Sequence, residues 1–170
     1  SSHIQNGEVD FSADNIDERI FTDCDSITVI ACGTAMHAGL IGKYLIEKTC
    51  GIPVTVCMAS EFMYSDPIIG DKTLVICVSQ SGETIDTLEA LKFARRRGAM
   101  SLSIVNVRES SIARESDNVI YTNAGPEIAV ASTKAYTAQV TVLYLITAKI
   151  AVLRESLNSE GESKFLAELE

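Results

Sequence analysis

The sequence is poor in the residues on which several classes of site depend. It has no tryptophan, 3 prolines and 2 histidines, and only 6% of its 170 residues are aromatic. Its 5 cysteines are odd in number, form no CxxC pair and lie mostly in apolar runs, where a free thiol packs as a small hydrophobic side chain. The sequence therefore predicts neither disulfides nor a metal site, and a reducing cytoplasm is the default compartment.

Positive charge is also scarce. The chain has 14 basic and 23 acidic side chains and a net charge of -9, which argues against a nucleic-acid partner. The longest basic run, 95–97, is typical of the last turn of a helix, where cations meet the negative end of the dipole. The most membrane-like stretch, 138–153, is too short to span a bilayer and contains Gln139 and Lys149.

Hydrophobic residues are abundant, and their spacing indicates the fold class. Runs rich in β-branched residues alternate with segments of 3.6-residue periodicity, of which 36–49 and 85–98 are the clearest. This alternation predicts one α/β domain, an αβα sandwich with a parallel sheet. The expected strands are 27–31, 54–59, 73–79, 101–107 and 118–122.

The stretch 131–155 is expected to form one long helix that is apolar around most of its circumference. Such a helix is buried on more than one side, either as a core helix or because it also packs on a partner domain or subunit. We interpret residues 1–15 as a tag remnant or linker, 16–155 as the domain and 156–170 as a linker toward a further domain.

The segment 79–84, Ser-Gln-Ser-Gly-Glu-Thr, joins an apolar strand to a helix and has the composition of an anion site. Helix-start amides lack internal partners and favour anions, and the side chains of Ser79, Gln80, Ser81 and Thr84 would add neutral donors. The alternative is an ordinary turn in which Ser81 or Thr84 caps the helix. We expect Glu83 and Asp86 to face solvent.

Two further loops are weaker candidates. Gly33 and Thr34 follow the first predicted strand, and a sugar contact by Val130 or Ser132 cannot be distinguished by spacing from capping of the long helix. No GxxxxGK[ST] or GxGxxG motif is present, so nucleotide cofactors are disfavoured. His37, Glu61 and Glu127 have no visible catalytic partner.

Three stretches together resemble a known family. ACGTAMHAG, SQSGETIDT and TNAGPEIAVASTKAYT, with the spacing between them, are similar to the first of the two sugar isomerase (SIS) domains in the glutamine:fructose-6-phosphate aminotransferases, the glucosamine-6-phosphate synthases. The resemblance covers about residues 16–155 and implies a five-stranded parallel sheet of flavodoxin-like topology.

The resemblance also implies a ligand and a division of labour. It places a phosphate cradle on Ser79, Gln80, Ser81 and Thr84, and sugar contacts on Gly33, Thr34, Val130 and Ser132, for fructose 6-phosphate or glucosamine 6-phosphate. The family often has Ser where this chain has Ala35, which puts one sugar contact in doubt.

By the same resemblance, the catalytic groups belong to an absent glutaminase domain and second SIS domain, and no cofactor or metal is required. We therefore expect a homodimeric cytoplasmic enzyme of which this fragment binds substrate without turning it over. A stand-alone SIS phosphosugar sensor, a fructosamine 6-phosphate deglycase and a dimerisation element with an empty crevice remain alternatives.

Overall fold

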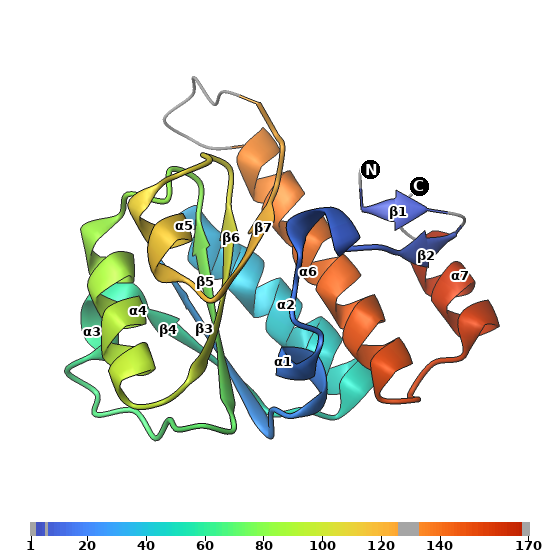
Figure 1. Ribbon diagram of the computed structural model, residues 1–170, viewed down its shortest axis with the longest axis horizontal. Coiled ribbons are helices and arrows are strands. Elements are labelled where there is room, and N and C mark those ends of the chain that lie inside the picture. The colour runs from blue at the N-terminus through green and yellow to red at the C-terminus, as the bar shows by residue number, and fades with distance from the viewer. Residues whose placement is uncertain (1–2, 6, 126–132, 168–170) are drawn as a thin grey trace.

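The protein is an αβα sandwich built on a five-stranded parallel sheet, as the sequence predicts (Figure 1). A computed structural model describes residues 3–5, 7–125 and 133–167. The strands lie in the order β4-β3-β5-β6-β7, and every neighbouring pair is parallel. Their bounds are β3 Ser26–Ala31, β4 Val54–Met58, β5 Thr73–Ser79, β6 Met100–Val105 and β7 Asn118–Tyr121.

Helices cover both faces of the sheet (Figure 1). One face carries α1 (Arg19–Thr22), α2 (Thr34–Cys50) and α6 (Lys134–Leu153), and the other carries α3 (Ala59–Phe62), α4 (Ile85–Arg96) and α5 (Ser111–Glu115). Side chains along β5 alternate between these layers: Ile76 and Val78 join the α2–α6 core, whereas Val75 and Cys77 join the α4 core. An apolar run buried on both faces is what a central parallel strand requires.

The strand order reverses between β3 and β5. From β3 the chain runs outward to β4, then crosses back to β5 and continues outward on the other side. The carboxyl ends of β3 and β5 are therefore neighbours, with Ala31 beside Val78 in the ladder. Open parallel sheets bind ligands at such a reversal, because the loops that follow the two strands diverge there.

The strand predicted over 101–107 ends at Val105, two residues earlier than expected. Asn106 leaves the ladder because its backbone N–H donates to the Gln80 carbonyl at 3.1 Å. Its side chain also bonds the loop after β7, with Nδ2 donating to the Gly125 carbonyl at 2.8 Å. These bonds join Asn106 to the loops that follow β5 and β7, at the position where β6 ends.

The long helix is confirmed as α6, and it is buried on more than one side. It packs on α2, and it also contacts α1, α7 (Ser159–Ala167) and β2 (Glu8–Val9). Within the described part of the chain it is also the one helix long and apolar enough to cross a membrane, but 56% of that apolar window is buried inside the protein. Its composition is thus explained by core packing.

The end segments, interpreted as linkers or a tag remnant, contain regular structure packed on the domain. A short hairpin of β1 (Ile4–Gln5) and β2 precedes η1 (Ser12–Asp14), and α7 lies against it. Glu162 of α7 is 4% exposed and accepts the Val9 N–H at 3.0 Å, while His3, 5% exposed, pairs with Asp14 at 2.8 Å. Polar composition concealed these contacts, because each depends on a partner distant in the sequence.

Helix α2 approaches its neighbours closely through two glycines. A Cβ on Gly39 would lie 2.8 Å from Cγ1 of Val29, and one on Gly42 would lie 3.1 Å from a methyl carbon of Leu143. The absence of side chains at these positions lets α2 lie against both β3 and α6. This packing fixes the start of α2, and hence Thr34, relative to the end of β5.

We predict that Gly39→Val destabilises the fold by at least about 2 kcal/mol, because the added carbons overpack the contact with Val29. Gly70→Val is the matched control, since a Cβ there meets nothing within 4 Å and should change stability by less than about 0.5 kcal/mol. Urea unfolding followed by circular dichroism measures both. Equal midpoints for the two variants would contradict close packing at Gly39.

Candidate functional site

A cavity of about 220 Å³ lies at the reversal of strand order, where the loops after β3 and β5 meet. It is lined by small polar and apolar side chains: Cys32, Thr34, Ala35, Val78, Ser79, Gln80, Ser81, Thr84 and Gln139. None of these lining residues carries a formal charge at neutral pH. All four residues predicted to form the cradle, Ser79, Gln80, Ser81 and Thr84, thus line one pocket.

The hydroxyl groups of the loop 79–84 are arranged by hydrogen bonds among themselves. The Oγ of Ser79, 4% exposed, accepts the Gly82 N–H at 3.1 Å and lies 3.1 Å from Oγ1 of Thr84. Ser81 Oγ accepts the Glu83 N–H at 3.2 Å. A hydroxyl that accepts from an amide still has its own hydrogen to donate, but one hydrogen of the Ser79–Thr84 pair is used between the two oxygens. The loop can thus offer the Ser81 hydrogen and one hydrogen of that pair without rearranging.

The start of α4 lacks the side-chain cap that the alternative interpretation expects. Thr84 is the N-cap residue, yet neither it nor Ser81 makes a capping bond to the helix. The first backbone bond of α4 runs from Leu88 N–H to the Thr84 carbonyl at 3.0 Å, which leaves the preceding amides without a helical acceptor. Those amides and the positive dipole end suit an anion.

The segment that follows β6 holds the loop 79–84 in place through hydrogen bonds. The Asn106 and Ile112 N–H groups donate to the Gln80 and Gly82 carbonyls at 3.1 and 2.9 Å. Glu83 does more than face solvent, because its Oε1 accepts the Ser111 N–H at 2.8 Å. Hydrogen bonding from Ser111 lowers the pKa of the Glu83 carboxyl. The carboxylate therefore stays ionised, and keeps accepting this bond, to a lower pH than a free glutamate would.

Gly82 meets a requirement that no other residue type fulfils here. Its φ is +66°, and an added Cβ would lie 2.0 Å from Oγ and 2.5 Å from Cβ of Ser110. Ser110 is 2% exposed, and within the described part of the chain its Oγ has no hydrogen-bond partner. The loop backbone therefore presses directly on this side chain.

The other predicted residues differ in their placement. Thr34 lines the cavity at the first turn of α2, whereas Gly33 does not line it and instead supplies a φ of +57° before the helix. Val130 and Ser132 lie outside the described residues. His37 and Glu61 are exposed and do not line the cavity.

Sequence reasoning missed Gln139 and Asn106. Gln139 of α6 lines the cavity although it is 3% exposed, and it enters the sequence analysis only as a polar interruption of an apolar stretch. The feature that could have identified Gln139 is its position on the helix. It lies on the same stripe as Ala135, Val142 and Leu143, which are all buried. Asn106 has no local signal, because its partners lie in two other loops.

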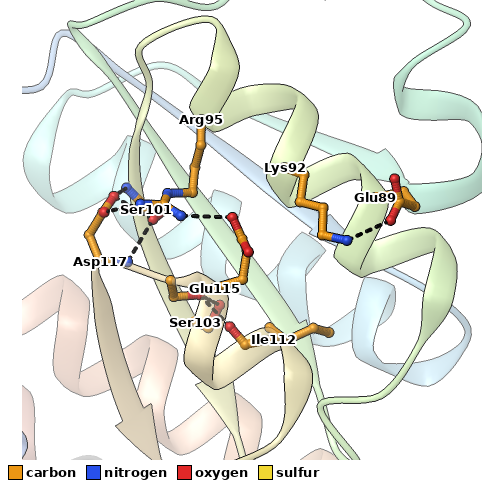
Figure 2. Close-up of polar contacts among 9 residues, drawn as sticks. Glu89, Lys92, Arg95, Ser101, Ser103, Ile112, Glu115 and Asp117 are labelled. Carbon is orange, nitrogen blue, oxygen red and sulfur yellow. Dashed lines mark hydrogen bonds and ion pairs between the residues drawn. The ribbon is translucent and has the colours of Figure 1, made fainter.

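A second polar cluster lies at the opposite edge of the sheet, near the starts of β6 and β7 (Figure 2). Arg95 bonds Glu115 and Asp117, each at 2.8 Å, and Asp117 accepts the Ser101 hydroxyl at 2.6 Å. Because two carboxylates already neutralise the charge of the Arg95 guanidinium, we interpret the cluster as a structural contact that holds α4 against the segment before β7. The basic run is confirmed at the end of α4, with Gly98 following it.

The thiol groups do not form a reactive site. All 5 cysteines are free, and burial raises the pKa of Cys50 to about 11 and that of Cys77 to about 12. Both are protonated at neutral pH and act as small apolar side chains. Within the described residues, no group of three or more His, Cys, Asp or Glu side chains has the arrangement of a metal site.

Comparisons with known proteins agree with this geometry. Residues 20–149 match the SIS domain family. The chain is 52% identical over 149 residues to a glutamine–fructose-6-phosphate aminotransferase (isomerizing) of Fusobacterium nucleatum, covering 88% of this chain and 24% of that protein. It is 47% identical over 156 residues to the enzyme of that name from Leifsonia xyli, covering 92% and 25%.

A solved structure gives the same result in three dimensions. The C-terminal domain of glucosamine-fructose-6-phosphate aminotransferase from Francisella tularensis superimposes with a TM-score of 0.93 at 41% identity, covering 98% of this chain and 47% of that one. The chain thus spans about a quarter of the length of the curated relatives it matches.

We predict that Gly82→Ala lowers stability by at least about 2 kcal/mol, because left-handed strain and overlap with Ser110 add together. Gly125→Ala is the matched control, since it has a φ of +69° but no atom within 4 Å of the new Cβ, so it has the strain alone. Thermal unfolding compares the two. Adding Ser110→Gly should recover the difference between them, and a failure to recover it would contradict the steric explanation.

Proposed function

The chain belongs to the SIS domain family, and on this premise we propose that it is the first, phosphosugar-binding half of the isomerase module of a glucosamine-6-phosphate synthase. The observation that carries the proposal is the neutral cavity at the reversal of strand order, which joins three hydroxyl groups to a helix start. The proposed ligand is fructose 6-phosphate or glucosamine 6-phosphate.

In this proposal Ser81 donates its hydroxyl hydrogen to a phosphate oxygen, and the Ser79–Thr84 pair donates the hydrogen that is not used between its two oxygens. The uncapped amides of α4 complete the cradle. Gln80 adds its amide group, and Thr34 contacts the sugar from the facing loop. Gly33 shapes the turn before α2 rather than lining the cavity. The resemblance still assigns Val130 and Ser132 to the sugar.

The strength of such a cradle can be bounded. Hydrogen bonds to a charged group contribute about 1.5–3 kcal/mol each. Roughly four of them, less an ordering cost of about 4 kcal/mol, leave about 2–8 kcal/mol, which corresponds to a dissociation constant from about micromolar to tens of millimolar. Anchoring the phosphate in this way fixes the unreactive end of the substrate, so that groups elsewhere can act on the other end.

We propose binding without turnover for the chain by itself. Cys32 is the only titratable side chain among the described residues that line the cavity, and general acid–base catalysis needs a positioned proton acceptor. Isomerisation would then depend on a second SIS domain, and ammonia release on a glutaminase domain. A cytoplasmic homodimer completes the proposal, which free thiols and the resemblance support.

We predict that fructose 6-phosphate shifts the amide resonances of residues 79–84 saturably, whereas fructose does not. Ser79→Ala combined with Thr84→Val should weaken binding at least tenfold, because the hydrogen that this pair donates to the phosphate is lost. Thr22→Val is the control, since this hydroxyl bonds Asp23 away from the cavity. A wild-type chain that gives no shift at about 20 mM ligand would overturn the proposed function. Turnover by the isolated chain would overturn the division of labour.

The neutral cradle also predicts an unusual salt dependence. Sites built on Lys or Arg lose affinity as salt screens their charges. Here no cation lines the cavity and the protein carries a net charge of -9, so screening reduces repulsion of the ligand. Between about 20 and about 300 mM sodium chloride, affinity should change by less than about twofold or increase. A severalfold loss, measured by calorimetry, would indicate an attracting cation and contradict the neutral mechanism.

A further inference from the structure

Gln139 is a polar residue on a buried stripe of α6. Its exposed fraction is 3%, and its neighbours one helical turn away, Ala135, Val142 and Leu143, are 2%, 3% and 0% exposed. Despite this burial it lines the cavity beside the loop 79–84. The amide thus borders the cavity from a helix stripe that is otherwise apolar.

The polar atoms of Gln139 make no hydrogen bond to a described residue, and they are not among the fully enclosed unpaired atoms, of which Ser110 Oγ is the one found in the described residues. The amide therefore reaches the cavity that it lines, where water or a ligand group can bond it. The cavity that it lines is large enough for several non-hydrogen atoms. An amide on an otherwise apolar, buried helix stripe that borders such a cavity is placed to bond a ligand group there.

Gln139 lies on the wall opposite the hydroxyl cradle. Val78 and Ala35, which also line the cavity, belong to the core between the sheet and the α2–α6 layer. Ser79 follows Val78 in the strand and so points toward the other layer, where Thr84 begins α4. A ligand whose phosphate lies in the cradle would therefore share this cavity with Gln139.

We propose that Gln139 contacts the substrate directly by bonding a hydroxyl group of the sugar chain, and that it makes the pocket prefer polyhydroxylated phosphate esters to phosphate alone. This inference rests on the proposed function of the cavity. The amide both donates through Nε2 and accepts through Oε1, which matches a hydroxyl group, itself a donor and an acceptor. A phosphate dianion only accepts, so it would leave Oε1 unbonded and facing negative charge.

The decisive variant is Gln139→Met, which keeps the length and helix propensity of the side chain but removes both polar atoms. We expect the affinity for fructose 6-phosphate to fall about three- to tenfold and that for inorganic phosphate to stay within about twofold. The melting temperature of the ligand-free variant checks that it is folded. Gln139→Leu repeats the measurement if the methionine variant folds poorly.

The control on the same helix is Thr147→Val, because Thr147 is also buried but donates its hydroxyl hydrogen to the Leu143 carbonyl at 2.8 Å. It should leave both affinities unchanged. Equal losses for fructose 6-phosphate and phosphate in Gln139→Met would make Gln139 a phosphate ligand and overturn the inference, and so would no loss for either. If the wild-type chain binds neither ligand, the proposed function fails first and the inference fails with it.

Discussion

The reversal of strand order between β3 and β5 is the constraint on which the rest of this structure depends. Because neighbouring crossovers leave the sheet on opposite faces, the loops after these two strands diverge and a cavity remains between them. Alternation along β5 then assigns each wall: Val78 faces the α2–α6 layer, and Ser79 faces α4. A one-residue shift in the register of β5 would point Val78 toward α4 and the Ser79 hydroxyl into the apolar core of the α2–α6 layer.

The absence of cations from the cavity determines its electrostatic character. In a protein of net charge -9, a phosphate ester bound in this cavity would be held by oriented dipoles rather than by long-range attraction. Dipoles act over short distances, so their geometry must be set before the ligand arrives. The bonds from Asn106, Ser111 and Ile112 to the loop 79–84 provide that preorganisation, and they come from backbone groups whose positions are fixed by β6 and α5.

Much of the fold follows from the sequence because its signals are local. The apolar runs of β3 and β5, the periodicity of α4 and its stop at Gly98 each depend on a few adjacent residues, and all were predicted to within two positions. The grouping of Ser79, Ser81 and Thr84 at one cavity was predictable for the same reason, since they occupy one short segment; their binding of phosphate stays a prediction. The terminal segments were not, because Glu162 bonds Val9 across 153 positions of sequence. Gln139 was overlooked because an apolar stripe indicates burial without indicating what lies beside it.

Asn106 explains how two distant parts of the candidate site are kept in register. Its backbone N–H holds the cradle through the Gln80 carbonyl, while its side-chain oxygen accepts from Thr122 Oγ1 at 3.0 Å and from the Ala124 N–H at 2.9 Å. The loop after β5 and the loop after β7 are therefore bonded to the same residue, across the end of β6. Since the segment after β7 leads toward the residues that the resemblance assigns to the sugar, a displacement of either loop must alter the bonds of the other. An amide serves this role where an apolar residue could not, because only a side chain with both a donor and an acceptor bonds a carbonyl and an N–H in the same loop.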